Sequence, residues 1–109
     1  MTQKVDKKHL AKAVVDARVQ FDLALHDKRR YPREHFRRLF SAVKAYADAT
    51  ANDEMMHRNV VQSVNGLCEL LEVERKNVPG EILFEADRLE TILFAGYDPS
   101  FDGDEPPGL

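Results

Sequence analysis

A chain of 109 residues and 12.5 kDa has room for one domain with one hydrophobic core, which excludes a separate catalytic domain on a second scaffold. Hydrophobic residues make up 43% of the sequence and charged residues 32%, with five Gly and five Pro. This composition is typical of a folded chain rather than a disordered one. The formal net charge is −3.

The cysteine content and the apolar runs exclude several classes of protein. Cys68 is the single cysteine, so no intramolecular disulfide can form, and the first nine residues lack the apolar stretch of a secretory signal. Charged residues interrupt every apolar run long before the roughly 18 positions that a membrane-spanning helix needs. There is no Cys-x-x-Cys and no His-Glu-x-x-His. We therefore expect a soluble cytoplasmic protein without a metal or another cofactor.

The charges are distributed unequally along the chain. Residues 1–50 carry 12 Lys and Arg against 6 Asp and Glu, a net charge of +6, whereas residues 51–109 carry 4 against 13, a net charge of −9. This asymmetry leaves two interpretations open. The halves face each other within the fold, or each half presents a surface to a partner of opposite charge.

Residues 5–28 form the first predicted helix. Its apolar face comprises Leu10, Ala13, Val14, Ala17, Phe21, Ala24 and Leu25. A second, thinner apolar stripe lies on the opposite side and consists of Val15, Val19 and Leu23. Isolated surface valines are ordinary in proteins. The alternatives are a central helix packed on two sides or a surface for self-association.

A second helix is predicted over residues 32–50, because Pro32 disfavours helical geometry at Tyr31 and suits the first turn of a new helix. Its apolar face is the clearest in the chain and comprises Phe36, Leu39, Phe40, Val43, Tyr46 and Ala47. Glu34 and Arg38 are four residues apart, which favours an ion pair on the helix surface.

Basic side chains are concentrated around the start of this second helix. The group comprises Lys28, Arg29, Arg30, Arg33, Arg37, Arg38 and Lys44. Arginine and lysine at this density can bind phosphates or an acidic protein surface. The low overall isoelectric point of about 5.8 argues against nucleic acid, because a nucleic-acid-binding domain is usually basic as a whole.

A third helix is predicted to begin at Asn52, a good N-cap residue that two acidic residues follow. Its apolar face comprises Met56, Val60, Val64, Leu67, Leu70 and Leu71. Asn65-Gly66 is a strong hairpin signal only between strictly alternating strands, and the alternation is absent here. We therefore predict helix through Gly66, with a break there as the alternative. Cys68 lies near the apolar face, as a small buried side chain rather than a reactive thiol.

The fourth predicted helix spans residues 81–95 and ends at Gly96, with Pro99 shortly after it. Its apolar face comprises Ile82, Ala86, Leu89, Ile92 and Leu93. The boundaries are therefore a helical domain over residues 1–96 and an acidic tail, rich in Pro and Gly, over residues 97–109. Residues 98–103 match the first half of a calcium loop, but Leu109 replaces the carboxylate expected at its twelfth position. We favour a tail that Tyr97 and Phe101 anchor to the helices.

Short connections between four helices of similar length predict an all-α fold, a single-domain antiparallel bundle of about four helices with a short irregular acidic C-terminal tail. The alternative is a three-helix core with one segment packed across it or exchanged between two subunits.

No nucleophile with a base, paired carboxylates or glycine-rich phosphate loop occurs at a recognisable spacing, so we expect no catalytic residue and no enzyme activity. The hypothesis that remains is a non-enzymatic helical protein that binds another macromolecule, with a protein as the favoured partner. An adaptor, an inhibitor, a regulatory subunit or a homodimer would fit. The partner-binding residues are the basic group defined above and the apolar stripe. The alternative is an accessory protein that contacts nucleic-acid phosphates through residues 28–38.

Overall fold

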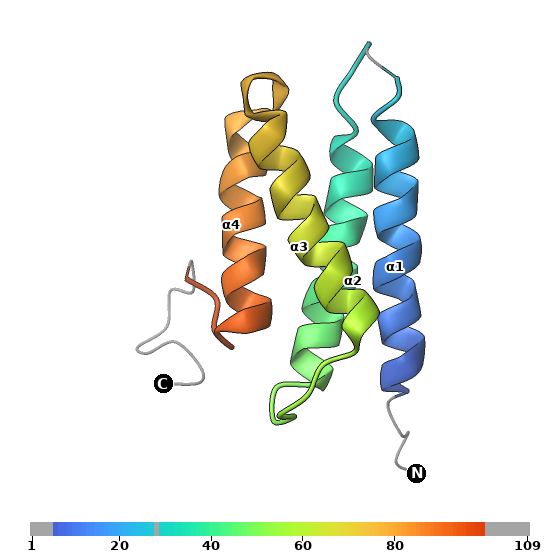
Figure 1. The fold of residues 1–109 in the computed structure, drawn as a ribbon, viewed down its shortest axis with the longest axis vertical. Coiled ribbons are helices and arrows are strands. Elements are labelled where there is room, and N and C mark those ends of the chain that lie inside the picture. The colour runs from blue at the N-terminus through green and yellow to red at the C-terminus, as the bar shows by residue number, and fades with distance from the viewer. Residues whose placement is uncertain (1–5, 28, 100–109) are drawn as a thin grey trace.

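Four α-helices run alternately up and down in this computed structural model, as Figure 1 shows. The structure describes residues 6–27 and 29–99. Its helices are α1 (Lys7–Ala24), α2 (Arg33–Ala49), α3 (Arg58–Val73) and α4 (Gly80–Phe94), and a short 3-10 helix, η1 (Arg75–Asn77), lies between the last two. No strand occurs in the described ranges, and the predicted all-α bundle is confirmed.

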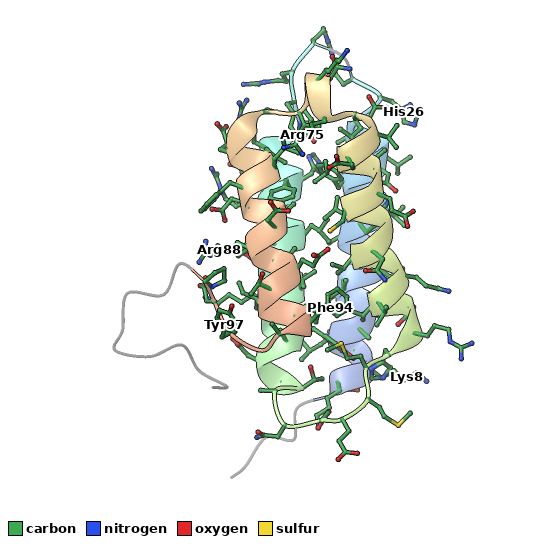
Figure 2. The ribbon with its side chains drawn as sticks, turned by 60° about the vertical axis from the view of Figure 1, so that its left-hand side comes forward. Lys8, His26, Arg75, Arg88, Phe94 and Tyr97 are labelled. Carbon is green, nitrogen blue, oxygen red and sulfur yellow. The ribbon has the colours of Figure 1, made fainter. Side chains whose placement is uncertain are left out.

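The helices pack in the order α1, α2, α4, α3 around the core. The most extensive packing joins α1 and α2, whereas α3 and α4 contact each other least and rest mainly on α1 and α2 respectively. The bundle can therefore be described as two layers, the α1–α2 layer and the α3–α4 layer. Figure 2 shows α3 and α4 in front of α1 and α2.

The core forms where the predicted apolar faces meet. The largest fully buried side chains are Val14, Phe21, Leu39, Val43, Tyr46, Val60, Val64, Leu67 and Leu89. Each large apolar side chain of this kind contributes about 1.5–3 kcal/mol when it leaves water. Phe21 also packs edge-to-face against Phe36 and Tyr31, with ring centroids 5.8 and 6.2 Å away. The contact between Phe21 and Tyr31 thus extends from the core into the loop between α1 and α2.

The first helix is shorter than predicted at its C-terminal end. Asp6 caps its start by accepting a hydrogen bond from the backbone N–H of His9, but the helix ends at Ala24 rather than near residue 28. The N–H groups of His26 and Asp27 turn back to the carbonyls of Leu23 and Ala24. This tighter turn closes the helix before the chain reaches the basic connection.

The start of α3 differs from the prediction, because Asn52 is not its N-cap. The helix begins at Arg58, with His57 as N-cap. The hydroxyl oxygen of the buried Tyr46 accepts a hydrogen bond from the His57 backbone N–H at 2.8 Å and lies 2.8 Å from its Nδ1. This contact fixes the chain at residue 57, so the segment before it forms a loop, which an ion pair between Asp53 and Lys7 ties to α1.

Gly66 lies within an unbroken α3, so the prediction of helix at this position is confirmed. The glycine has a packing role, because Arg18 reaches across from α1 and its Nη1 donates to the Ser63 carbonyl at 2.6 Å. A Cβ atom at position 66 would lie 2.9 Å from the same nitrogen. The missing side chain therefore allows the guanidinium to approach the backbone of α3, which offsets the low helix propensity of glycine.

The end of α4 follows the prediction at Gly96, where the backbone adopts a positive φ of 83°. The next residues return along the helix, because Nε and Nη2 of Arg88 donate to the Asp98 carboxylate at 2.8 and 2.7 Å. The same guanidinium stacks on the Phe40 ring of α2, 5.2 Å from its centroid. The tail anchor predicted at Phe101 lies outside the described residues.

Replacing Tyr46 with Phe should lower the free energy of unfolding by about 1–2 kcal/mol, because the backbone N–H of His57 loses its acceptor. Urea unfolding followed by circular dichroism measures the change. Tyr97→Phe is the matched control, since the Tyr97 hydroxyl makes no hydrogen bond within the described residues. Equal stability of both variants would contradict the role given to Tyr46.

Candidate functional site

The predicted basic residues are distributed over the α1–α2 loop and the length of α2. Arg29 and Arg30 lie in the loop between α1 and α2, and the other described members, Arg33, Arg37, Arg38 and Lys44, lie along α2. Lys28 lies outside the described residues. The basic residues therefore extend from the loop along α2, where Arg33 and Arg37 line a groove between α2 and α4.

About half of these basic side chains form ion pairs. Arg29 pairs with Asp27 at 3.1 Å and Arg33 with Glu81 of α4 at 2.7 Å. Glu34 was predicted to pair with Arg38, but it pairs with Arg37, one turn of the helix away, at 2.8 Å. The basic side chains without an ion pair in the described part of the chain are Arg30, Arg38 and Lys44, and all three are exposed.

The two layers have opposite net charges. The described residues up to position 50 hold 10 Lys and Arg against 6 Asp and Glu, a net charge of +4. The described residues from position 51 onward hold 4 against 10, a net charge of −6. Because α1 and α2 form one layer and α3 and α4 the other, the charge asymmetry of the sequence becomes a charge difference between two sides of the bundle.

Ion pairs between the layers are few. Within the described ranges, only Lys7–Asp53 at 2.9 Å and Arg33–Glu81 at 2.7 Å join a basic residue of the first half to an acidic residue of the second half. The remaining pairs form within one layer, mostly three or four residues apart on one helix. Both layers therefore keep most of their net charge on their solvent-exposed surfaces.

The predicted apolar stripe on α1 is partly exposed. Val15 is half-buried, whereas Val19 and Leu23 are 47% and 58% exposed. Arg18, the neighbour of Val19 in sequence, contacts α3 at Ser63. The stripe thus borders the edge of the bundle where α1 meets α3, and α1 is not a central helix packed on two sides.

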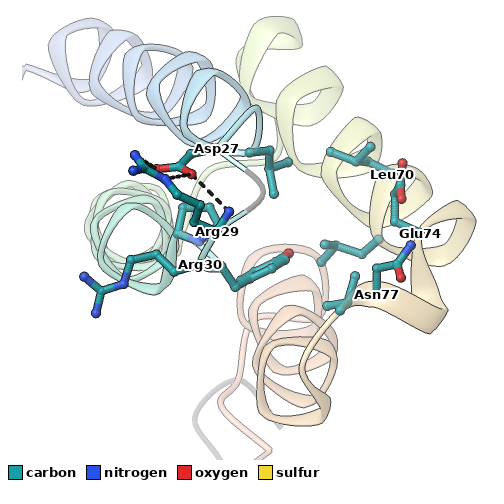
Figure 3. Close-up of a pocket in the computed structure, with 11 residues that line it drawn as sticks. Asp27, Arg29, Arg30, Leu70, Glu74 and Asn77 are labelled. Atoms are coloured by element: carbon teal, nitrogen blue, oxygen red, sulfur yellow. Dashed lines mark hydrogen bonds and ion pairs between the residues drawn. The ribbon is translucent and has the colours of Figure 1, made fainter.

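A pocket lies at the end of the bundle that carries the α1–α2 loop. It has a volume of about 510 Å³, within the range of pockets that hold small ligands. One wall comes from this loop and the other from the end of α3 and η1, as the close-up in Figure 3 shows. We call it the loop-end pocket; its apolar lining residues are Leu25, Pro32, Leu70, Leu71 and Val78.

Tyr31 gives this pocket an unusual polar group. Its hydroxyl oxygen is shielded from solvent and has no hydrogen-bond partner among the described residues. Burial raises the pKa of the Tyr31 phenol to about 12, and the negative charge of Glu74 adds to the effect. A buried donor without an acceptor costs about 1–3 kcal/mol, so this hydroxyl does not contribute to the stability of the empty pocket.

The charged groups around the loop-end pocket balance one another. Figure 3 shows Arg29 folded onto Asp27 and Arg30 extending away from the pocket. The side-chain and backbone hydrogen bonds from Arg29 hold the pKa of Asp27 below its usual value. Glu74 and Asn77, on the opposite wall, are exposed and form no ion pair or side-chain hydrogen bond in the described structure.

Cys68 has an environment that suppresses its reactivity. Burial raises the pKa of the Cys68 thiol to about 12, and the carboxylates of Glu90 and Asp87 on α4 add to the effect. Within residues 6–27 and 29–99, no three His, Cys, Asp or Glu side chains gather closely enough to hold a metal ion. The Asp98 carboxylate, the first oxygen of the half calcium motif, binds Arg88.

Comparisons of this chain with protein-family models, with curated proteins and with solved structures find no match. None of the helices in the described ranges combines the length and apolar character that crossing a bilayer requires.

Sequence reasoning did not find the loop-end pocket. Its walls come from residues 25–27, 29–32 and 70–78, which include segments far apart in the sequence that carry no shared motif. The one local signal was an aromatic residue, Tyr31, directly before a proline at a helix boundary. Such a residue often packs on the end of a helix, but nothing in the sequence shows that its hydroxyl lacks an acceptor.

The Cys68 thiol should react with a disulfide reagent at pH 8 roughly two to three orders of magnitude more slowly than in urea-unfolded protein, because its raised pKa removes thiolate. Glu90→Gln should speed the reaction several-fold, whereas Glu69→Gln, which changes an exposed charge on α3, should not. Equal rates in the two variants would contradict the effect of Glu90.

Proposed function

We propose that this chain is a non-enzymatic cytoplasmic protein that binds an acidic surface of another protein through its α1–α2 layer. The observation that carries the proposal is the separation of charge between the layers, which follows from a net charge of +4 on the described residues up to position 50 and −6 on those from position 51 onward. Complementary charge steers association and selects the partner more than it adds affinity. A regulatory subunit, an adaptor or an inhibitor would use such a surface.

Exposed cations without an ion pair in the described structure support an acidic surface as the partner. Arg30, Arg38 and Lys44 lose no intramolecular ion pair when they contact a carboxylate of another protein. The exposed Val19 and Leu23 on α1 add apolar area to the same layer. A surface with an apolar strip and unpaired charges at its rim matches the usual composition of protein interfaces.

A nucleic acid is the second candidate partner. The opposite layer is acidic, but it does not rule out this partner, because two layers of helices separate the outer faces by roughly 20 Å and the Debye length is only about 8 Å. A protein remains favoured, since ion pairs with Glu81 and Glu34 already engage two of the α2 cations, Arg33 and Arg37. Affinity for a nucleic acid rises with the number of phosphates that Lys and Arg neutralise.

A second copy of this chain is a special case of an oppositely charged partner. A twofold axis pairs one surface with itself, so it cannot place two opposite faces against each other. At the edge where α1 meets α3 both layers are present. A twofold axis there can place the basic layer of one copy against the acidic layer of the other. The Val19 and Leu23 side chains border this edge and would lie in the contact.

Binding through the α1–α2 layer is tested with a fluorescein-labelled peptide rich in Glu and Leu and with a short DNA duplex. Fluorescence anisotropy measures the binding of each at low and at high salt. We expect the peptide to bind at low salt and the double variant Arg38→Glu/Lys44→Glu to weaken binding roughly two- to fivefold. Arg58→Glu is the matched control, because it reverses an exposed charge on α3.

Stronger binding of the duplex than of the peptide, with a steep loss of affinity as salt rises, would replace the protein partner with a nucleic acid. Equal weakening by Arg58→Glu and by the double variant would contradict a binding surface on the α1–α2 layer.

For self-association, Val19→Glu should shift the mass in solution from dimer toward monomer without unfolding the chain, because a charge replaces an apolar contact. Sedimentation equilibrium measures the mass. A wild-type protein that stays monomeric at high concentration would rule out the dimer.

A further inference from the structure

The charge-based function does not use the interior of the loop-end pocket, although Arg30 lies at its edge. We propose that this pocket binds an uncharged ligand that carries an amide group on an apolar body, and that the Tyr31 hydroxyl donates a hydrogen bond to the amide carbonyl. The proposal stands independently of the proposed protein partner.

The apolar body of the ligand fits the walls of the pocket. Leu25 and Pro32 line it from the loop, and Leu70, Leu71 and Val78 line it from the other side. Its volume of about 510 Å³ is sufficient for a small organic molecule or for one apolar residue with its neighbouring peptide groups. Apolar walls with a few convergent polar groups are the usual composition of a ligand pocket.

The Tyr31 hydroxyl identifies a hydrogen-bond acceptor on the ligand. Tyr46 shows how this protein satisfies a buried phenol, since its oxygen accepts the N–H of His57 and also contacts the imidazole. Tyr31 has no such partner within the described residues, although its oxygen is equally shielded from water. An acceptor brought by a ligand would complete the missing hydrogen bond, and phenylalanine at this position could not serve that purpose.

The opposite wall identifies a donor on the same ligand. The Glu74 carboxylate and the Asn77 side chain both line the pocket, and neither is engaged by another described side chain. A carboxylate accepts hydrogen bonds only, and the amide oxygen of Asn77 accepts as well. An amide offers a carbonyl oxygen to Tyr31 and an N–H group to these acceptors, so one uncharged group can satisfy both walls.

The charges around the pocket disfavour ionised ligands. Asp27 and Arg29 neutralise each other through hydrogen bonds of 3.1 and 3.3 Å. A ligand carboxylate beside Tyr31 would face the negative charge of Glu74, which already acts on the phenol. A ligand ammonium donates hydrogen bonds only, so it would leave the Tyr31 O–H without an acceptor.

The test uses isotope-labelled full-length protein and three related probes: N-acetyl-leucinamide, which is uncharged, N-acetyl-leucine, which is a carboxylate, and leucinamide, which carries an ammonium group. We expect N-acetyl-leucinamide to bind most tightly and to shift the amide resonances of Leu70, Leu71 and Val78. The amide can come from a peptide segment or from a free small molecule, and a blocked Gly-Leu-Gly peptide distinguishes the two. Tighter binding of this peptide than of N-acetyl-leucinamide points to a peptide segment, and weaker binding points to a free small molecule.

The decisive variant is Tyr31→Phe. It should weaken binding of N-acetyl-leucinamide roughly three- to tenfold, while the urea midpoint of the free protein stays the same or rises, because the lost hydroxyl has no partner there. Tyr97→Phe, at the end of α4 and outside the pocket, should change neither quantity.

Three results would overturn the proposal. The first is an absence of shifts at the pocket with every probe up to its solubility limit. The second is tighter binding of the carboxylate or the ammonium probe than of the uncharged amide. The third is a Tyr31→Phe protein that binds N-acetyl-leucinamide equally well or unfolds more easily. Easier unfolding would show that Glu74 or another group of the chain accepts a hydrogen bond from the Tyr31 hydroxyl in solution.

Discussion

Burial of one apolar face from each of four helices is the constraint on which the rest of the structure depends. Once the helices pack in the order α1, α2, α4, α3, most charged side chains lie on the outside of the layer to which their helix belongs. Arg18 and Arg88 are exceptions, because each reaches across to the other layer. A basic first half and an acidic second half then become two sides of one molecule. Few ion pairs cross between the layers, so packing and not charge attraction holds the layers together.

Helical periodicity predicted most of the core because each apolar face is regular, but it missed the buried Ala11 of α1 and Val78 before α4. All five residues predicted for the face of α4 are buried, and α3 continues through Gly66 as expected. The errors occur where a tertiary contact decides the end of a helix. Asn52 had the local features of an N-cap, but the hydroxyl of Tyr46 binds the backbone at His57, which is 11 residues from Tyr46, and the helix begins only after that contact.

The candidate surfaces were predictable only in part, for a physical reason. Exposure of Val19 and Leu23 follows from their position on the helix opposite the core, and the structure shows both exposed. A pocket depends on the gap between segments that are distant in the chain, and no local pattern encodes the size of that gap. Likewise, the choice of Arg37 over Arg38 as the partner of Glu34 depends on side-chain conformations rather than on spacing alone.

The central claim is that the two layers present opposite electrostatic potentials to solvent. Paramagnetic relaxation of backbone amides by an anionic and by a cationic cosolute of equal size measures this potential residue by residue. The account predicts stronger relaxation by the anionic cosolute along the outer faces of α1 and α2, and stronger relaxation by the cationic cosolute along α3 and α4. Equal relaxation by both cosolutes on both layers would contradict it.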